Sequence, residues 1–243
     1  MILCLIYMGV CLLLGQHSRA AKKTREVLYL FLVMAVIAIG STAIQYTPFK
    51  PIDQSILNGS QWMHLDLTAL MHWSATHPML YHSMEVAYDS IPLQMAYLPL
   101  VLILFGQFER LHEYYFLLLL TAFIGYTFYY FFPTTAPASI LESPYFTEAQ
   151  HATGLKFHQI HAHIKPTTLE GGMIAFPSFH VIWAWLCAFM VRDWPLAFMV
   201  ILTLNIAVTF SCVLLGWHYI LDVIASVMVL LFSYAVYSKA YPK

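Results

Sequence analysis

Long apolar runs are the feature that most constrains the fold of this chain. A helix that crosses a membrane needs roughly 17–25 predominantly apolar residues, and several runs of about this length are separated by polar segments. Hydrophobic residues make up 60% of the 243 residues and charged residues only 9%, far from the balance of a soluble domain. The sequence predicts an all-α integral-membrane protein with about six to seven transmembrane helices in a single domain, residues 1–243.

The apolar runs predict seven spans. They lie at about 2–18, 27–45, 91–106, 114–132, 176–191, 196–215 and 219–238. The first run is short for a helix that crosses a membrane, but no basic residue precedes it as in a secretory signal, so we expect it to be retained as a span.

Basic residues are divided unevenly between the two sides of this predicted bundle. One side carries eight, namely Arg19, Lys22, Lys23, Arg25, Arg110, Arg192, Lys239 and Lys243, and the other carries Lys50, Lys156 and Lys165. The positive-inside tendency places the larger set in the cytoplasm. The long segments 46–90 and 133–175 then lie outside, which predicts an active site on the extracytoplasmic face of the cytoplasmic (inner) membrane.

Net charge and cysteine usage exclude other classes of function. The formal net charge is −1, which gives no basic field to attract nucleic acid. All four cysteines fall in apolar runs without metal-ligand spacing, so they are interpreted as small buried hydrophobic residues. The expected partners are therefore the lipid bilayer and small molecules within it.

The segment "GWHYILDVIAS" places ionisable residues where a span begins. His218 and Asp222 are four residues apart, so in a helix they share a face and the carboxylate can hold one imidazole nitrogen. This arrangement suits a histidine nucleophile oriented by an acid. The alternative is a pair that only satisfies itself, although ionisable residues at membrane depth are rare and usually functional.

A second group of residues lies in "GGMIAFPSFHVIWAW", where Gly171 and Gly172 precede Pro177, Ser178 and His180. Proline fits the first turn of a helix, and the free amides of a helix N-terminus with a serine hydroxyl form a site for an anion such as phosphate. His180 could then donate a proton to a leaving oxygen. The alternative interpretation of His180 is a structural histidine in the core that bonds to a backbone group.

The predicted topology brings these two groups to the same outer level, because both spans begin there. The end of the fourth span, "FFPTTAPAS", arrives at that level too and offers Thr134, Thr135 and Ser139 as hydrogen-bond donors. An active site formed by three helix ends is the expected result.

The strings "PSFH" and "HYILD" resemble the paired motifs of the type-2 phosphatidate phosphatase superfamily, with the motifs falling within residues 130–235. Ser211, His218 and Asp222 match its pattern of serine, six residues, histidine, three residues and aspartate. The resemblance implies that His218 attacks phosphorus to form a phosphohistidine, Asp222 orients it and His180 protonates the leaving group. Ser178 and Ser211 would hold phosphate oxygens.

Departures from the phosphatase pattern favour one branch of that superfamily. The lysine and Arg-Pro string of the phosphatases is missing, Cys212 replaces an arginine and Phe179 replaces a glycine. With "FPTTAPAS" before Phe-Pro-Ser-x-His, the chain looks more like the inositol phosphorylceramide synthase group. The resemblance implies transfer of a phospho-head group from a lipid phosphate to a lipid alcohol.

Phosphate still requires positive charge or dense hydrogen bonding, because the transition state spreads negative charge over its oxygens. Lys165 is the best outer candidate, with Lys156 and Lys50 behind it, and backbone amides near Gly172 can contribute. The string "HQIHAH" could bind zinc or copper, but it matches no standard closed site. We therefore predict neither a metal nor another cofactor.

These observations predict a lipid phosphotransferase or phosphatase. Transfer and hydrolysis share the first half-reaction and differ in whether an alcohol or water resolves the phosphohistidine. Hydrolysis of a phosphatidate or isoprenoid phosphate is the alternative. The non-enzyme alternative is a transporter or an inactive scaffold.

Overall fold

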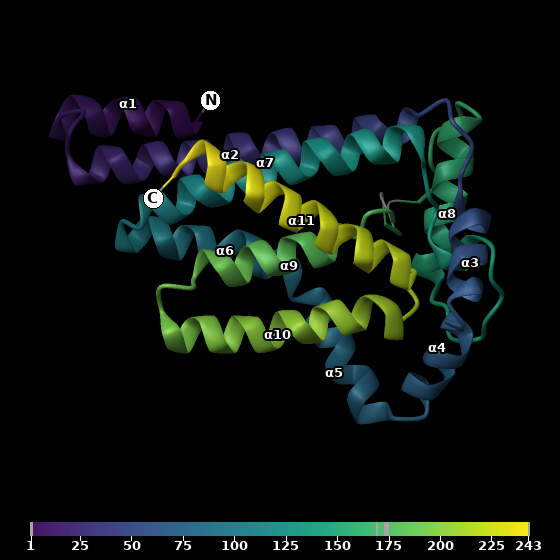
Figure 1. The fold of residues 1–243 in the computed structure, drawn as a ribbon. Coiled ribbons are helices and arrows are strands. Elements are labelled where there is room, and N and C mark those ends of the chain that lie inside the picture. Colours follow the sequence, from purple (N-terminus) through teal and green to yellow (C-terminus); the bar gives the residue numbers. More distant parts are fainter. Residues whose placement is uncertain (1, 169, 173–174, 243) are drawn as a thin grey trace.

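The computed structural model describes residues 2–168, 170–172 and 175–242, and within these ranges the chain is helical without strands (Figure 1). The helices are α1 (Ile2–Leu14), α2 (Arg19–Ala43), η1 (Ile44–Tyr46), α3 (Asp53–Trp62), α4 (Leu67–Ala75), α5 (Pro78–Asp89), α6 (Ile91–Phe105), α7 (Phe108–Phe131), η2 (Pro137–Ser139), α8 (Glu148–His161), α9 (Phe179–Met190), α10 (Pro195–Leu214) and α11 (Ile220–Ala240). The predicted all-α fold is confirmed.

Four of the described helices, α2, α7, α10 and α11, are long and apolar enough to cross a membrane. The pair α5 and α6, bent by 48° at its break, would make a fifth span. These helices indicate an integral membrane protein. Seven spans were expected, but α1 and α9 contain only 13 and 12 residues.

The two short helices are limited by local signals that interrupt their apolar runs. Gly15 has a φ of 82° just after α1, a left-handed conformation that glycine adopts at helix ends. Ser18 then caps α2, accepting a hydrogen bond from the backbone N–H of Ala21 at 3.1 Å. At α9, Ser178 fills the same position and delays the start of the helix until Phe179.

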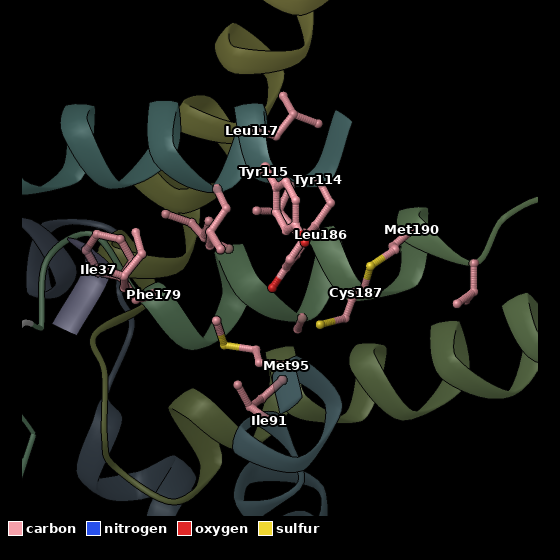
Figure 2. Packing of buried hydrophobic residues seen from close by; sticks show 14 of the residues in the cluster. Ile37, Ile91, Met95, Tyr114, Tyr115, Leu117, Phe179, Leu186, Cys187 and Met190 are labelled. Carbon is pink, nitrogen blue, oxygen red and sulfur yellow. The ribbon is translucent and has the colours of Figure 1, made fainter. Parts of the chain in front are cut away.

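Helix α9 lies at the centre of the main core despite its length, packed against α6, α7, α10 and α11. Figure 2 shows its side chains among residues of α6 and α7. The labelled residues include Phe179, Leu186, Cys187 and Met190 of α9, Ile91 and Met95 of α6, and Tyr114, Tyr115 and Leu117 of α7. Because lipid tails are as apolar as these side chains, close packing rather than escape from water stabilises such an arrangement. The neighbours of α9 thereby fix the direction of its N-terminus.

Helices α3, α4 and α8 lie across the end of the bundle at which α9 and α11 begin (Figure 1). At the opposite end, Arg110 and Arg192 donate to the buried carboxylate of Glu113 at 3.0 and 2.7 Å. Arg110 also pairs with Asp193 in the connection between α9 and α10. The bundle therefore has one end closed by ion pairs and another covered by three short helices.

Candidate active site

His218 lies in the connection between α10 and α11 and is 4% exposed. Its Nδ1 lies 2.9 Å from the carbonyl oxygen of Ala175 and 3.2 Å from Oδ2 of Asp222. Since both partners accept hydrogen bonds when the carboxyl is ionised, Nδ1 carries the hydrogen and Nε2 retains its lone pair. Burial lowers the pKa of His218, which also favours this neutral form.

Asp222 occupies the first turn of α11 and is fully buried. Its Oδ2 also accepts a hydrogen bond from the backbone N–H of Tyr219 at 2.9 Å. A carboxylate is favoured at a helix N-terminus, where free N–H groups and the helix dipole stabilise negative charge. The capping contact fixes the carboxylate, so Asp222 in turn fixes the ring of His218.

His180 is the second residue of α9, and its ring centroid lies 6.1 Å from that of His218. The starts of α9 and α11 are joined by two hydrogen bonds. Ser178 donates its N–H to the carbonyl of Asp222 at 3.4 Å, and the hydroxyl of Ser226 donates to the carbonyl of Ser178 at 3.0 Å. These bonds bring together the two motifs that the sequence separates by about 40 residues.

Both histidines line one cavity of about 190 Å³. Its other described lining residues are Ser41, Tyr88, Tyr126, Ala136, Thr153, Gly171, Gly172, Ala175, Phe179, Trp183 and Trp217. This lining is largely aromatic and includes no described lysine, arginine, aspartate or glutamate. The cavity can thus surround an apolar group next to two imidazoles.

Tyr88, at the end of α5, lines the cavity but was not among the residues predicted from the sequence. Its ring stacks on His180 with centroids 4.1 Å apart and planes 15° apart. It also lies 5.3 Å from Trp217 with planes 8° apart. No local signal could have identified it, because Tyr88 and His180 are 92 residues apart.

The expected phosphate-binding residues occupy different environments. Gly172 lines the cavity and donates its N–H to the hydroxyl of Thr153 at 2.8 Å. Ser178 and Ser211 are fully buried, and Ser211 donates to the carbonyl of Val208 at 2.7 Å. Lys165 is exposed, and the described lining does not include it or either serine.

Lys156, rather than Lys165, is the buried cation near the cavity. It extends from α8, is 9% exposed, and donates to the carbonyl oxygens of Glu170 and Gly171 at 3.0 Å each. Burial lowers the pKa of its ammonium group. Because Gly171 lines the cavity, Lys156 fixes part of the cavity wall.

Asp53 fixes the segment that follows α7. It is 2% exposed and accepts hydrogen bonds from the backbone N–H of Thr135, at 2.9 Å, and from the hydroxyl of that residue, at 3.1 Å. Burial raises the pKa of Asp53 to about 6; the bonds from Thr135 oppose this shift, and the nearby Asp222 adds to it. Ala136, the next residue along the chain, lines the cavity.

This raised pKa predicts a pH-dependent stability. Between pH 4 and 6 the carboxyl of Asp53 keeps its proton in the folded protein but loses it in the unfolded chain. The free energy of unfolding therefore decreases by about 3 kcal/mol as pH rises through this range. Asp53→Asn should remove this contribution. The midpoint of thermal unfolding in mild detergent should then fall less between pH 4.5 and 6.5 in the variant than in the parent. Equal pH slopes would show that Asp53 is not responsible.

The histidines of "HQIHAH" lie in the last turn of α8 and just after it. His161 stacks on Phe157 with centroids 4.1 Å apart. Within the described ranges, no three or more histidine, cysteine, aspartate or glutamate residues are grouped so that they could hold a metal ion.

Comparison with known proteins identifies the family. A family model described as the PAP2 superfamily matches residues 54–236, about three quarters of the chain, including His180, His218 and Asp222. The chain belongs to the PAP2 superfamily. Membership of the PAP2 superfamily indicates phosphatase or phosphotransferase activity on phosphate esters, and the apolar helices are consistent with a lipid phosphate in a membrane. No curated protein and no solved structure matches significantly.

Proposed function

We propose that this protein transfers a phospho-head group between lipids through a phosphohistidine on His218, as the inositol phosphorylceramide synthase-like group does. The observation that carries the proposal is the environment of His218. Its Nδ1 is bound by Ala175 and Asp222, while the described residues provide Nε2 with no hydrogen bond, and the residue lines a cavity shared with His180. This is the arrangement of an oriented nucleophile next to an acid.

The reaction is a double displacement. Nε2 of His218 attacks phosphorus, the N–P bond forms as the bond to the leaving oxygen breaks, and the imidazolium form of His180 gives a proton to that oxygen and becomes neutral. In the second step, His180 removes the proton of the acceptor alcohol, whose oxygen attacks phosphorus and releases His218. Asp222 stabilises the charge that develops on the imidazole of His218.

The charge of the cavity supports a phosphodiester as the donor. A phosphomonoester carries close to two negative charges at neutral pH, whereas a phosphodiester carries one. The described lining offers no lysine or arginine, but Phe179 and His180 are the first residues of α9, where backbone N–H groups lack helical partners and favour anions. Phosphate contacts from Gly172, Ser178, Ser211 and Lys165 stay predictions.

We further propose that the site faces the extracytoplasmic side of the inner membrane. Arg110 and Arg192 belong to the predicted cytoplasmic set and lie together at one end of the bundle, bound to Glu113. His180 is in the first turn of α9 and His218 directly precedes α11, at the other end of the bundle, across which α3, α4 and α8 lie (Figure 1). The positive-inside tendency supports this orientation.

The experiment that tests the function uses purified protein in detergent–lipid micelles. Head-group-labelled phosphodiester and phosphomonoester lipids are supplied with and without ceramide or diacylglycerol, and His218→Ala serves as the control. We expect a new labelled phospholipid that appears only with an acceptor and only with the parent protein. Release of head group regardless of acceptor would make the protein a hydrolase, and binding without turnover would indicate a transporter or scaffold.

A further inference from the structure

We propose that Tyr88 is a positioning residue that holds His180 in the orientation needed to protonate the leaving group. This inference rests on the proposed role of His180. Nothing in the sequence motifs assigns a function to Tyr88, which lies in the outer segment before the first motif.

The ring of Tyr88 connects the two parts of the site. It stacks on His180 of α9 at 4.1 Å and lies nearly parallel to Trp217 at 5.3 Å. Trp217 directly precedes His218, so the same ring contacts both the acid and the segment that carries the nucleophile. Aromatic stacking of this kind favours one orientation of the two rings beyond the effect of burial alone.

The hydroxyl of Tyr88 also influences which nitrogen of the His180 ring faces the substrate. Its oxygen lies 3.4 Å from Nδ1 of His180, and no other hydrogen bond to this ring is found among the described residues. A hydroxyl can donate to a neutral Nδ1 or accept from a protonated one. In the imidazolium form, Nδ1–H donates to this hydroxyl, which leaves Nε2–H to face the leaving oxygen. Because 3.4 Å is long for a hydrogen bond, we expect the stack to contribute more than the hydroxyl.

Tyr88 is itself firmly held. Tyr88 lies near the end of α5, next to the bend that leads into α6. The residue is 8% exposed and packs with Val181, Cys212 and Leu215. Purely structural packing is therefore the competing explanation, and the test must separate it from positioning of the acid.

The test compares two substrates that differ in their need for an acid. One is a lipid phosphodiester whose alkoxide must be protonated as it leaves, and the other is the p-nitrophenyl ester of the same phospho-head group, whose phenolate leaves without a proton. Loss of a general acid typically costs 10²–10⁴-fold. We expect Tyr88→Leu to lower the single-turnover rate of leaving-group release from the alkyl ester at least about 10-fold, and Tyr88→Phe about 3-fold, with little change for the aryl ester.

Three controls separate the possible failures. Tyr115→Phe removes another buried tyrosine hydroxyl, bonded to the carbonyl of Glu26 at 3.1 Å, and should leave the ratio of the two rates unchanged. His180→Ala should reproduce the selective loss in this first step, and His218→Ala should abolish leaving-group release from both esters. If both Tyr88 variants keep the parent's ratio of alkyl to aryl rates, the proposal for Tyr88 is wrong. Turnover that survives in His218→Ala would instead overturn the proposed function.

Discussion

Replacement of His218 by alanine is expected to lower kcat/KM by at least about 10⁴-fold, the largest effect of any single substitution in this chain. The variant removes the nitrogen that forms the bond to phosphorus, and no described neighbour can replace it, because Asp222 is fully buried behind the ring. Initial rates of phospholipid formation at several donor concentrations would measure the loss.

A matched control is His82→Ala. His82 lies on α5, 78% of its side chain is exposed, and it contacts Glu85 one helical turn away. Its replacement should therefore change the rate less than about twofold. If His218→Ala retains more than about a hundredth of the parent rate while folding normally, a covalent histidine mechanism would be contradicted.

Asp222→Asn is expected to have the second large effect and to lower kcat about 10³–10⁴-fold. Losses of this scale are observed when an orienting carboxylate is removed from a catalytic triad. Oδ2 of Asp222 accepts from both the N–H of Tyr219 and Nδ1 of His218. An amide at this position can donate to Nδ1, which would move the hydrogen to Nε2 and remove the attacking lone pair. Single-turnover rates of donor cleavage would show the loss before any acceptor is involved.

Asp66→Asn provides the control for this change. Asp66 caps α4 by accepting from the N–H of Ala69 at 3.1 Å, in an exposed position, and asparagine caps about equally well. A rate for Asp222→Asn within tenfold of the parent would show that the carboxylate has no role in orienting the nucleophile.

The sequence was most informative where the decisive contact is local. His218 and Asp222 are one helical turn apart, so their contact follows from spacing alone. Helices α2, α7, α10 and α11 follow from composition over about 20 residues. The lengths of α1 and α9 did not follow from composition. Gly15 ends α1 inside an apolar run, and Ser18 and Ser178 are the caps at which α2 and α9 begin.

Contacts between distant segments could not be predicted. Asp53 binds Thr135, 82 residues away, and Tyr88 stacks on His180 from another helix. Lys156 likewise donates to the carbonyl oxygens of Glu170 and Gly171, 14 and 15 residues away, whereas Lys165 is exposed. Spacing along the sequence does not give this difference in burial.

The most direct test of the central claim is to trap the covalent intermediate. The parent protein is mixed with a donor lipid labelled in its phospho-head group, without acceptor, then quenched with alkali and digested for peptide mapping by mass spectrometry. A covalent histidine mechanism predicts an acid-labile, alkali-stable phospho-head group on the peptide containing His218, absent from His218→Ala. Label on another residue, or turnover with no labelled protein at any time, would contradict it.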